Sequence, residues 1–341
     1  MSITAPALPD QVAKLLGPIS GTATVWGLEL AVRLGLVDLL ATRPDGLSAE
    51  DAAGALDLDP LYTHVILRSA YAAEVLERDG DRYRLADHMA TLLLDQDHPA
   101  FLGGALKVFV AMRETFLDLR RFAGTGQREW WSNFDPEWID AVGTHCQAYY
   151  RRLVDTVLPQ LPKVQARFVA GARLLDVACG TCRGPAKIVD AHPATRVTAV
   201  DADAYTLGVA EREMKERGIG DRFTFVESFL ESLDIDGGHD VAHVNVSLHE
   251  ARDIPEAVAR VHRALEPGGT FLVSEFPFPE HEEDCRTVPG RIMCGVQFFE
   301  SHIGCQLLPA GHFVEHLERA GFRDVGVIDV NPMHVVIHGT K

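Results

Sequence analysis

The sequence predicts an α/β protein with two parts, a mainly helical N-terminal domain and a doubly wound, mostly parallel sheet. Two observations support this fold class. After residue 170, short β-branched runs alternate with helical stretches, which is typical of a parallel sheet covered by helices. Before residue 100, three apolar helical stretches precede a short hairpin signal, which is the element order of a winged helix.

Composition limits the class of partner. The chain has 341 residues, enough for about two domains, and carries 32 basic and 49 acidic residues for a net charge of -17. Such a charge repels nucleic acid and anionic membrane surfaces, so neither is expected as a partner. No signal peptide and no membrane-spanning stretch are expected. The six cysteines lack the spacing of a small secreted domain, which favours reduced thiols in the cytoplasm.

The N-terminal domain is built from local signals. Residues 17–41 have apolar residues at helical spacing, and Ser48 with Asp51 forms a box-like N-cap for a second helix. A third helix is expected at residues 61–76, and the Asp-Gly turn within residues 77–85 predicts a hairpin. These helices carry few basic residues, so we expect dimerisation rather than DNA binding.

The rest of the chain divides into helices and then strands. We expect a winged-helix domain at residues 1–100, linker and pocket helices at 101–165, and a sheet domain at 166–341. A polar, aromatic break at 124–136 interrupts the linker helices, whose last member carries three candidate pocket residues, His145, Tyr149 and Tyr150. Strands are expected at residues 174–178, 196–200, 223–226, 240–246, 270–274, 325–330 and 334–338.

A cofactor site is predicted where the first of these strands ends. The strand leads into a loop of small residues that opens a helix, and Ala178, Gly180 and Gly184 would let a ligand approach the backbone. The second strand ends in Asp201 and Asp203, and a carboxylate there can accept hydrogen bonds from both hydroxyls of a ribose.

Three further features argue against a nicotinamide site. The loop is not G-x-G-x-x-G, and an acid, Asp176, lies inside the strand before it. The third strand ends at Ser228 and Phe229, where an adenine could stack on the aromatic ring. Residues 265–269, with the sequence L-E-P-G-G, form a turn into the fifth strand.

With these motifs the chain resembles the class I S-adenosylmethionine-dependent methyltransferases, whose sheet is Rossmann-like. It is most similar to the dimeric small-molecule O-methyltransferases that have an N-terminal winged-helix domain, and the resemblance covers nearly the whole chain. The resemblance implies a homodimer, a secondary-metabolite acceptor and S-adenosylmethionine as cofactor. It implies cofactor contacts for Asp176, Ala178, Gly180, Asp201, Asp203, Ser228, Phe229 and Asn245.

Some of these positions depart from the family pattern. Ala178 and Cys182 stand where glycine is commoner, and Ser228 stands where an acid is usual. Cys182 is expected to add bulk beside the cofactor. Cys179 and Cys182 form a C-x-x-C, but no second pair lies at zinc-ligand spacing, so we expect these thiols to pack in the loop.

The resemblance also places the reaction centre. His249 matches the family's general base, Glu250 matches the acid after it, and Glu275 matches a glutamate that orients the base. A second orienting glutamate is expected within residues 305–313, but that stretch has no acid. The orienting pair is therefore predicted to be incomplete.

Two other functions stay open. His249, Glu250 and His302 would supply two imidazoles and a carboxylate, a ligand set for non-haem iron or another divalent metal. This arrangement is similar to that of methyltransferases that act on the carbon beside a 2-oxo acid. Without the metal, His302 is expected only to line the substrate pocket. A third possibility is a non-methylating descendant that keeps the cofactor as a scaffold.

Overall fold

The computed structural model describes residues 7–341, apart from the side chains of Glu114 and Ser132. The chain forms two compact units that meet between Val110 and Ala111. The stretch expected as a linker, residues 101–165, contributes most of its length to the second unit.

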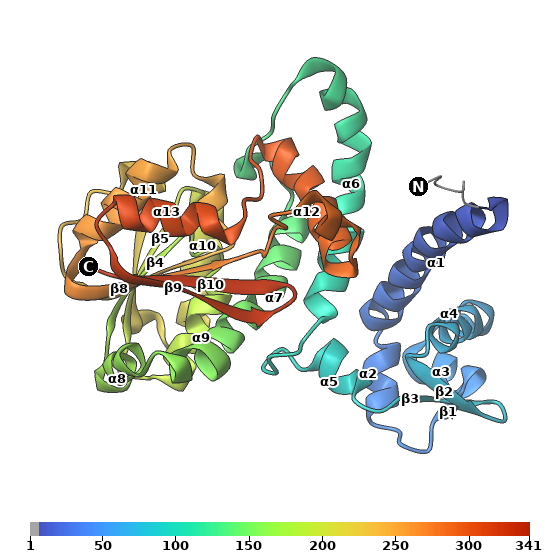
Figure 1. Ribbon diagram of the computed structural model, residues 1–341. Coiled ribbons are helices and arrows are strands. Elements are labelled where there is room, and N and C mark those ends of the chain that lie inside the picture. Colours follow the sequence, from blue (N-terminus) through green and yellow to red (C-terminus); the bar gives the residue numbers. More distant parts are fainter. Residues whose placement is uncertain (1–6) are drawn as a thin grey trace. The chain divides into compact units, whose positions relative to one another are not determined.

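The first unit contains helices and one small sheet (Figure 1). Its strands pair antiparallel in the order β1-β3-β2, so the predicted hairpin is present. The single helix expected at residues 17–41 is two helices, because Gly35 at the break has a φ of 75°, outside the helical range. The elements are α1 (Leu8–Arg33), α2 (Leu36–Ala41), β1 (Leu47–Ser48), α3 (Ala49–Leu56), α4 (Pro60–Ala72), β2 (Leu76–Asp79), β3 (Arg82–Leu85) and α5 (Met89–Leu94).

Side-chain caps fix where two of these helices begin. The Ser48 hydroxyl accepts a hydrogen bond from the amide of Asp51 at 3.0 Å, as the capping pattern predicts. The carboxylate of Asp59 does the same for the first turn of α4. The helices then bury a leucine-rich core that includes Leu36, Leu40 and Leu67.

Helix α1 corrects one sequence prediction. It is long and apolar enough, by length and composition, to cross a membrane, although no such stretch was expected. Only 17% of its most apolar window is buried inside the chain. Several of its large apolar side chains, among them Leu15 and Ile19, are therefore exposed.

The second unit is built on one seven-stranded sheet in the order β6-β5-β4-β7-β8-β10-β9. All seven predicted strands are present, and only β10 runs antiparallel to its neighbours. The strands are β4 (Arg173–Val177), β5 (Arg196–Asp201), β6 (Phe223–Glu227), β7 (His239–Asn245), β8 (Leu265–Glu275), β9 (Arg323–Asn331) and β10 (His334–Thr340). The strand order reverses beside β4, so the carboxyl ends of β4, β5 and β7 form one edge where ligands bind in such sheets.

The second unit also contains α-helices. They are α6 (Gly103–Thr125, which begins in the first unit), α7 (Pro136–Arg152), α8 (Pro162–Ala170), α9 (Arg183–Ala191), α10 (Ala204–Glu216), α11 (Ile254–Ala264), α12 (Val288–Ile303) and α13 (Ala310–Arg319). Strand residues alternate between two apolar cores: Leu174 packs in one, and Leu175 and Val177 pack in the other.

A buried polar network ties α7 to the sheet. The Tyr150 hydroxyl donates to the Asp176 carboxylate at 2.9 Å, and His243 Nδ1 meets the same carboxylate at 2.9 Å. His243 Nε2 in turn lies 3.1 Å from the Ser274 hydroxyl. The Tyr150 ring covers Gly184 at the start of α9 so closely that a Cβ there would lie 2.3 Å from ring carbons.

This contact predicts that Gly184→Ala destabilises the chain by about 1–3 kcal/mol, because the buried Tyr150 ring would have to move. Urea unfolding measures the change. The matched control is Gly208→Ala in exposed α10, where an added Cβ meets nothing within 4 Å. That change should be neutral or stabilise by up to about 1 kcal/mol. Equal stability of the two variants would contradict the prediction.

Candidate active site

The loop between β4 and α9 has the conformation that its small residues predict. Ala178, Gly180 and Cys182 all have positive φ, at 54°, 56° and 57°. The Gly180 amide donates to one oxygen of Asp201 at 2.8 Å, and the Asp203 amide donates to the other at 3.0 Å. Burial raises the pKa of Asp201 to about 6, although these backbone hydrogen bonds favour the ionised form. The space beside Gly180 is open, since a Cβ there would meet nothing within 4 Å.

Two residues predicted to contact the cofactor, Asp203 and Asp176, form hydrogen bonds within the chain. Asp203 was expected as a substitute for Asp201, but its carboxylate caps α10 through the amide and hydroxyl of Thr206. Asp176 is wholly buried, and its oxygens are engaged by Tyr150 and His243. The roles of Asp176 and Asp203 toward a cofactor stay predictions.

The remaining cofactor candidates lie at the ends of β6 and β7. Ser228 donates its amide to the carbonyl of Asp201 at 2.9 Å. Phe229 is 40% exposed, and its ring lies 5.7 Å from that of Trp130, with the Arg252 guanidinium against both rings. Asn245 is buried, and its Oδ1 has no hydrogen-bond partner among the described residues.

The two cysteines of the loop pack inward. Cys179 and Cys182 both belong to the apolar core beneath α9. Cys182 is wholly buried, so its side chain does not add bulk on the open side of the loop, which corrects that expectation. Burial raises the pKa of both thiols, in keeping with a packing role.

His249 lies just beyond β7 and is held by Glu275 at the end of β8. Its Nδ1 is 2.8 Å from Glu275 Oε2, and Glu275 Oε1 accepts from the amide of Leu248 at 3.0 Å. His249 and Glu275 are therefore brought together as predicted. Burial lowers the pKa of His249, but the charges of Glu275 and Glu300 outweigh that effect and hold the pKa well above its usual value.

Glu300 of α12 is the site residue that the sequence did not reveal. Its Oε2 lies 3.2 Å from His249 Nε2, but the two atoms are not aligned for a hydrogen bond. Glu250 lies beside them, and the indole of Trp131 donates to its Oε2 at 2.7 Å. Burial and the Glu300 charge raise the pKa of Glu250 to about 8. The second acid beside His249 thus comes from α12 and not from residues 305–313.

His302 does not join this cluster, which corrects the predicted ligand set. Its ring packs against Phe122 and Phe134, with centroids 4.9 Å and 5.7 Å away. Neither ring nitrogen has a hydrogen-bond partner among the described residues. The structure therefore does not assemble His249, Glu250 and His302 around one point.

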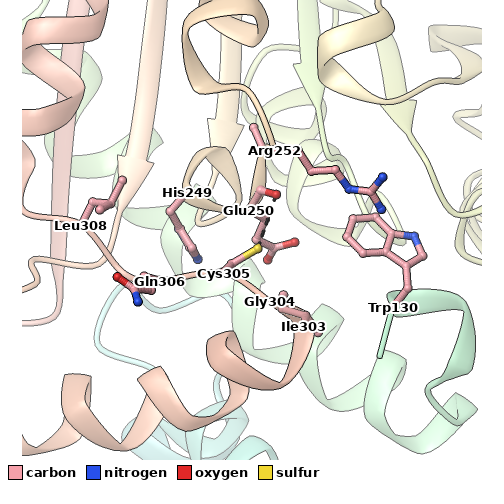
Figure 2. A pocket seen from close by; sticks show the side chains of 10 residues that line it. Trp130, His249, Glu250, Arg252, Ile303, Gly304, Cys305, Gln306 and Leu308 are labelled. Atoms are coloured by element: carbon pink, nitrogen blue, oxygen red, sulfur yellow. Dashed lines mark hydrogen bonds between the residues drawn. The ribbon is translucent and has the colours of Figure 1, made fainter. Parts of the chain in front are cut away.

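A cavity of about 300 Å³ opens beside His249 and Glu250 (Figure 2). Its lining residues are Trp130, His249, Glu250, Ala251, Arg252, Ile303, Gly304, Cys305, Gln306 and Leu308. The four predicted pocket residues are not among them. Tyr150 binds Asp176, Tyr149 packs edge-on against His334, and His145 packs against Tyr149. Burial lowers the pKa of His145 to about 4, so this ring is neutral at physiological pH.

The sequence comparisons concern the sheet and the loops at its edge. Residues 174–269 match the family described as "Methyltransferase domain". This part of the chain is therefore similar to a methyltransferase domain. The chain is 32% identical over 114 residues to the ubiquinone/menaquinone biosynthesis C-methyltransferase UbiE of Hahella chejuensis, which is 32% of this chain and 45% of that protein. The chain thus spans about half the length of the curated relatives that it matches.

Solved structures extend the likeness to both units as a likeness of fold. An O-methyltransferase family protein from Burkholderia thailandensis superposes with a TM-score of 0.67 at 18% identity, covering 99% of each chain. Human N-acetylserotonin methyltransferase, solved with S-adenosylmethionine, has the same TM-score, identity and coverage. These solved structures therefore share the fold of this chain along nearly its whole length.

Proposed function

We propose that this protein is an S-adenosylmethionine-dependent methyltransferase that methylates a hydroxyl of a small molecule. The observation that carries the proposal is the buried His249–Glu275 pair, 2.8 Å apart, at the same edge of the sheet as the Asp201 loop. The Asp201 loop can hold a methyl donor, and His249 can take a proton from an acceptor.

The residues at the loop fit S-adenosylmethionine. Asp201 presents a carboxylate that can accept hydrogen bonds from ribose hydroxyls, and Gly180 leaves room for a ligand against the backbone. The exposed ring of Phe229 offers a stacking surface for adenine. The cofactor supplies a methyl group on a sulfonium, and these residues bind and orient it.

The acceptor fits a small organic compound. A cavity of about 300 Å³ holds a single small ring system, and His249 is at its wall. Glu275 holds Nδ1, so Nε2 is the ring nitrogen that can take the acceptor's proton when the imidazole is neutral. The acidic composition argues against nucleic acid, and six free cysteines suit a cytoplasmic protein.

Carbon methylation is the second candidate. The curated relatives that match the methyltransferase domain are named as C-methyltransferases and demethylmenaquinone methyltransferases. The 2-oxo-acid form of this hypothesis loses the support of His302, which packs away from His249. A panel that includes both phenols and carbon acceptors distinguishes the two by the mass and chemistry of the product.

Substitution of His249 tests the catalytic proposal. His249→Ala should lower turnover by roughly a hundred- to ten-thousand-fold, because the residue that contacts the acceptor is lost, while S-adenosylmethionine still binds. Release of S-adenosylhomocysteine with a panel of acceptors measures turnover, and calorimetry measures binding. The exposed His281→Ala is the control. Normal turnover by His249→Ala would rule the catalytic role out, and a wild type that binds cofactor but methylates nothing would favour the scaffold alternative.

Cofactor affinity should depend on pH through Asp201. The free carboxyl has a pKa of about 6, and ribose hydroxyls bind its ionised form, so binding should strengthen as pH rises through 6. At pH 5 only about a tenth of the carboxyls would be ionised, which predicts about tenfold weaker binding than at pH 8. Calorimetry at several pH values checks this. Asp201→Asn should weaken binding and flatten the profile, whereas a flat wild-type profile would contradict the proposed contact.

We also propose a homodimer formed through the N-terminal unit. Apolar side chains are exposed along two of its helices: Leu8, Val12, Leu15, Leu16, Ile19, Trp26 and Leu30 on α1, and Leu61, Tyr62, Val65 and Tyr71 on α4. A contiguous apolar surface of this extent is typical of an obligate interface between copies.

The double change Leu15→Glu and Ile19→Glu should therefore give a monomer, because two buried carboxylates would destabilise the interface. Light scattering after gel filtration at micromolar concentration measures the mass. Lys14→Glu on the same exposed helix is the control and should remain dimeric. A wild type that is monomeric under these conditions would overturn the proposal.

A further inference from the structure

Three side chains converge beside the cavity, and two of them, His249 and Glu250, line it. His249 and Glu250 come from the short helix after β7, and Glu300 comes from α12. One ligand-type atom from each lies within 4.8 Å of the others. In Figure 2, the His249 ring and the Glu250 carboxylate both lie at the pocket beside Cys305.

Two of these atoms are buried and lack hydrogen bonds. His249 and Glu300 are only 4% and 3% exposed, and neither His249 Nε2 nor Glu300 Oε2 has a hydrogen-bond partner among the described residues. Buried polar atoms almost always have a hydrogen-bond partner. Two buried polar atoms that face each other without a hydrogen bond therefore indicate a missing ligand that both of them contact. The carboxylates of Glu250, Glu275 and Glu300 surround the ring, so that ligand should be a cation.

The spacing fits a metal ion. Imidazole nitrogen and carboxylate oxygen bind divalent cations at about 2.0–2.2 Å. Two such ligands on one ion lie about 3.0 Å apart at a right angle and about 3.4 Å apart at the tetrahedral angle. The observed separation of His249 Nε2 and Glu300 Oε2 is 3.2 Å, between these values.

The surroundings also suit a metal ligand. A histidine that binds a metal usually donates its other ring N–H to a carboxylate, and His249 Nδ1 lies 2.8 Å from Glu275 Oε2. This hydrogen bond leaves the lone pair on Nε2, toward the cluster. Trp131 orients Glu250 in a similar way, because its indole N–H donates a hydrogen bond to Glu250 Oε2.

We propose that His249, Glu250 and Glu300 bind one divalent transition-metal ion, with open coordination positions toward the cavity. One imidazole and two carboxylates suit Zn²⁺, Mn²⁺ or Fe²⁺ better than Mg²⁺ or Ca²⁺, which prefer oxygen ligands alone. An oxygen of the acceptor can occupy an open position. The binding site stands independently of the proposed function, but its presence would make His249 a metal ligand rather than the proton acceptor.

The test measures metal directly. Protein stripped with chelator is dialysed against Zn²⁺, Mn²⁺ or Fe²⁺ (the last without oxygen), and bound metal is measured by plasma mass spectrometry. The wild type should bind about one ion per chain. His249→Ala and Glu300→Gln should each lose it, and Glu275→Gln should weaken binding by about 10- to 100-fold. His302→Ala is the matched control from the same helix and should keep the ion.

Calorimetry with S-adenosylmethionine shows that each variant is folded, because the cofactor residues lie outside the cluster. A folded Glu300→Gln that keeps the full complement of metal, or a wild type that binds none, would overturn the metal site. Loss of metal in His302→Ala with retention in Glu300→Gln would also overturn it. Methyl transfer by the metal-free wild type would show that the acceptor does not need the metal, and it would leave the proposed methyltransferase function intact. A protein that binds the metal but methylates no acceptor would keep the metal site and overturn the proposed methyltransferase function.

Discussion

The carboxylate of Asp176 is wholly buried, and the arrangement of much of the second unit depends on the hydrogen bonds that this carboxylate accepts. Its hydrogen bonds come from Tyr150 on α7 and His243 on β7, and His243 continues to Ser274 on β8. Because an unpaired buried charge is strongly destabilising, these partners are held in place together. Burial raises the pKa of Asp176, which the hydrogen bonds oppose.

This network positions both parts of the site. The Tyr150 ring presses on Gly184, so α7 sets where α9 begins and therefore where the loop between β4 and α9 ends. On the other side, Ser274 precedes Glu275, whose carboxylate holds His249. The loop after β4 and the His249–Glu275 pair thus lie at two ends of one hydrogen-bonded network.

The sequence was most informative where structure is local. β-branched runs predicted all seven strands of the large sheet, and the Ser48 cap and the loop glycines behave as their chemistry requires. It was least informative about helix faces. Glu300 and His302 lie two residues apart on α12, so the helix turns them about 200° from each other and only one can face His249. The spacing fits either residue, and tertiary packing selected Glu300 by burying His302 among aromatic rings.

Long-range packing also determines where the side chains of Tyr149 and Tyr150 lie. Tyr149 and Tyr150 look like pocket residues because each joins an aromatic ring to a hydroxyl, and α7 lies next to the sheet. The buried acid in β4 engages the Tyr150 hydroxyl, and this pairing depends on two segments 26 residues apart. The cavity beside His249 is lined instead by Trp130, by the segment after β7 and by residues at and after the end of α12, and neither Trp130 nor the segment after α12 has a motif in the sequence.

The same type of side chain does different work at the two ends of the sheet edge. Asp201 receives backbone amides and keeps oxygen lone pairs for a neutral, hydroxyl-bearing ligand. Glu275 faces an imidazole, and the carboxyl groups of Glu250 and Glu300 lie close to the same ring. A pocket with this excess of acid holds positive charge strongly between Nε2 of His249 and the acids around it.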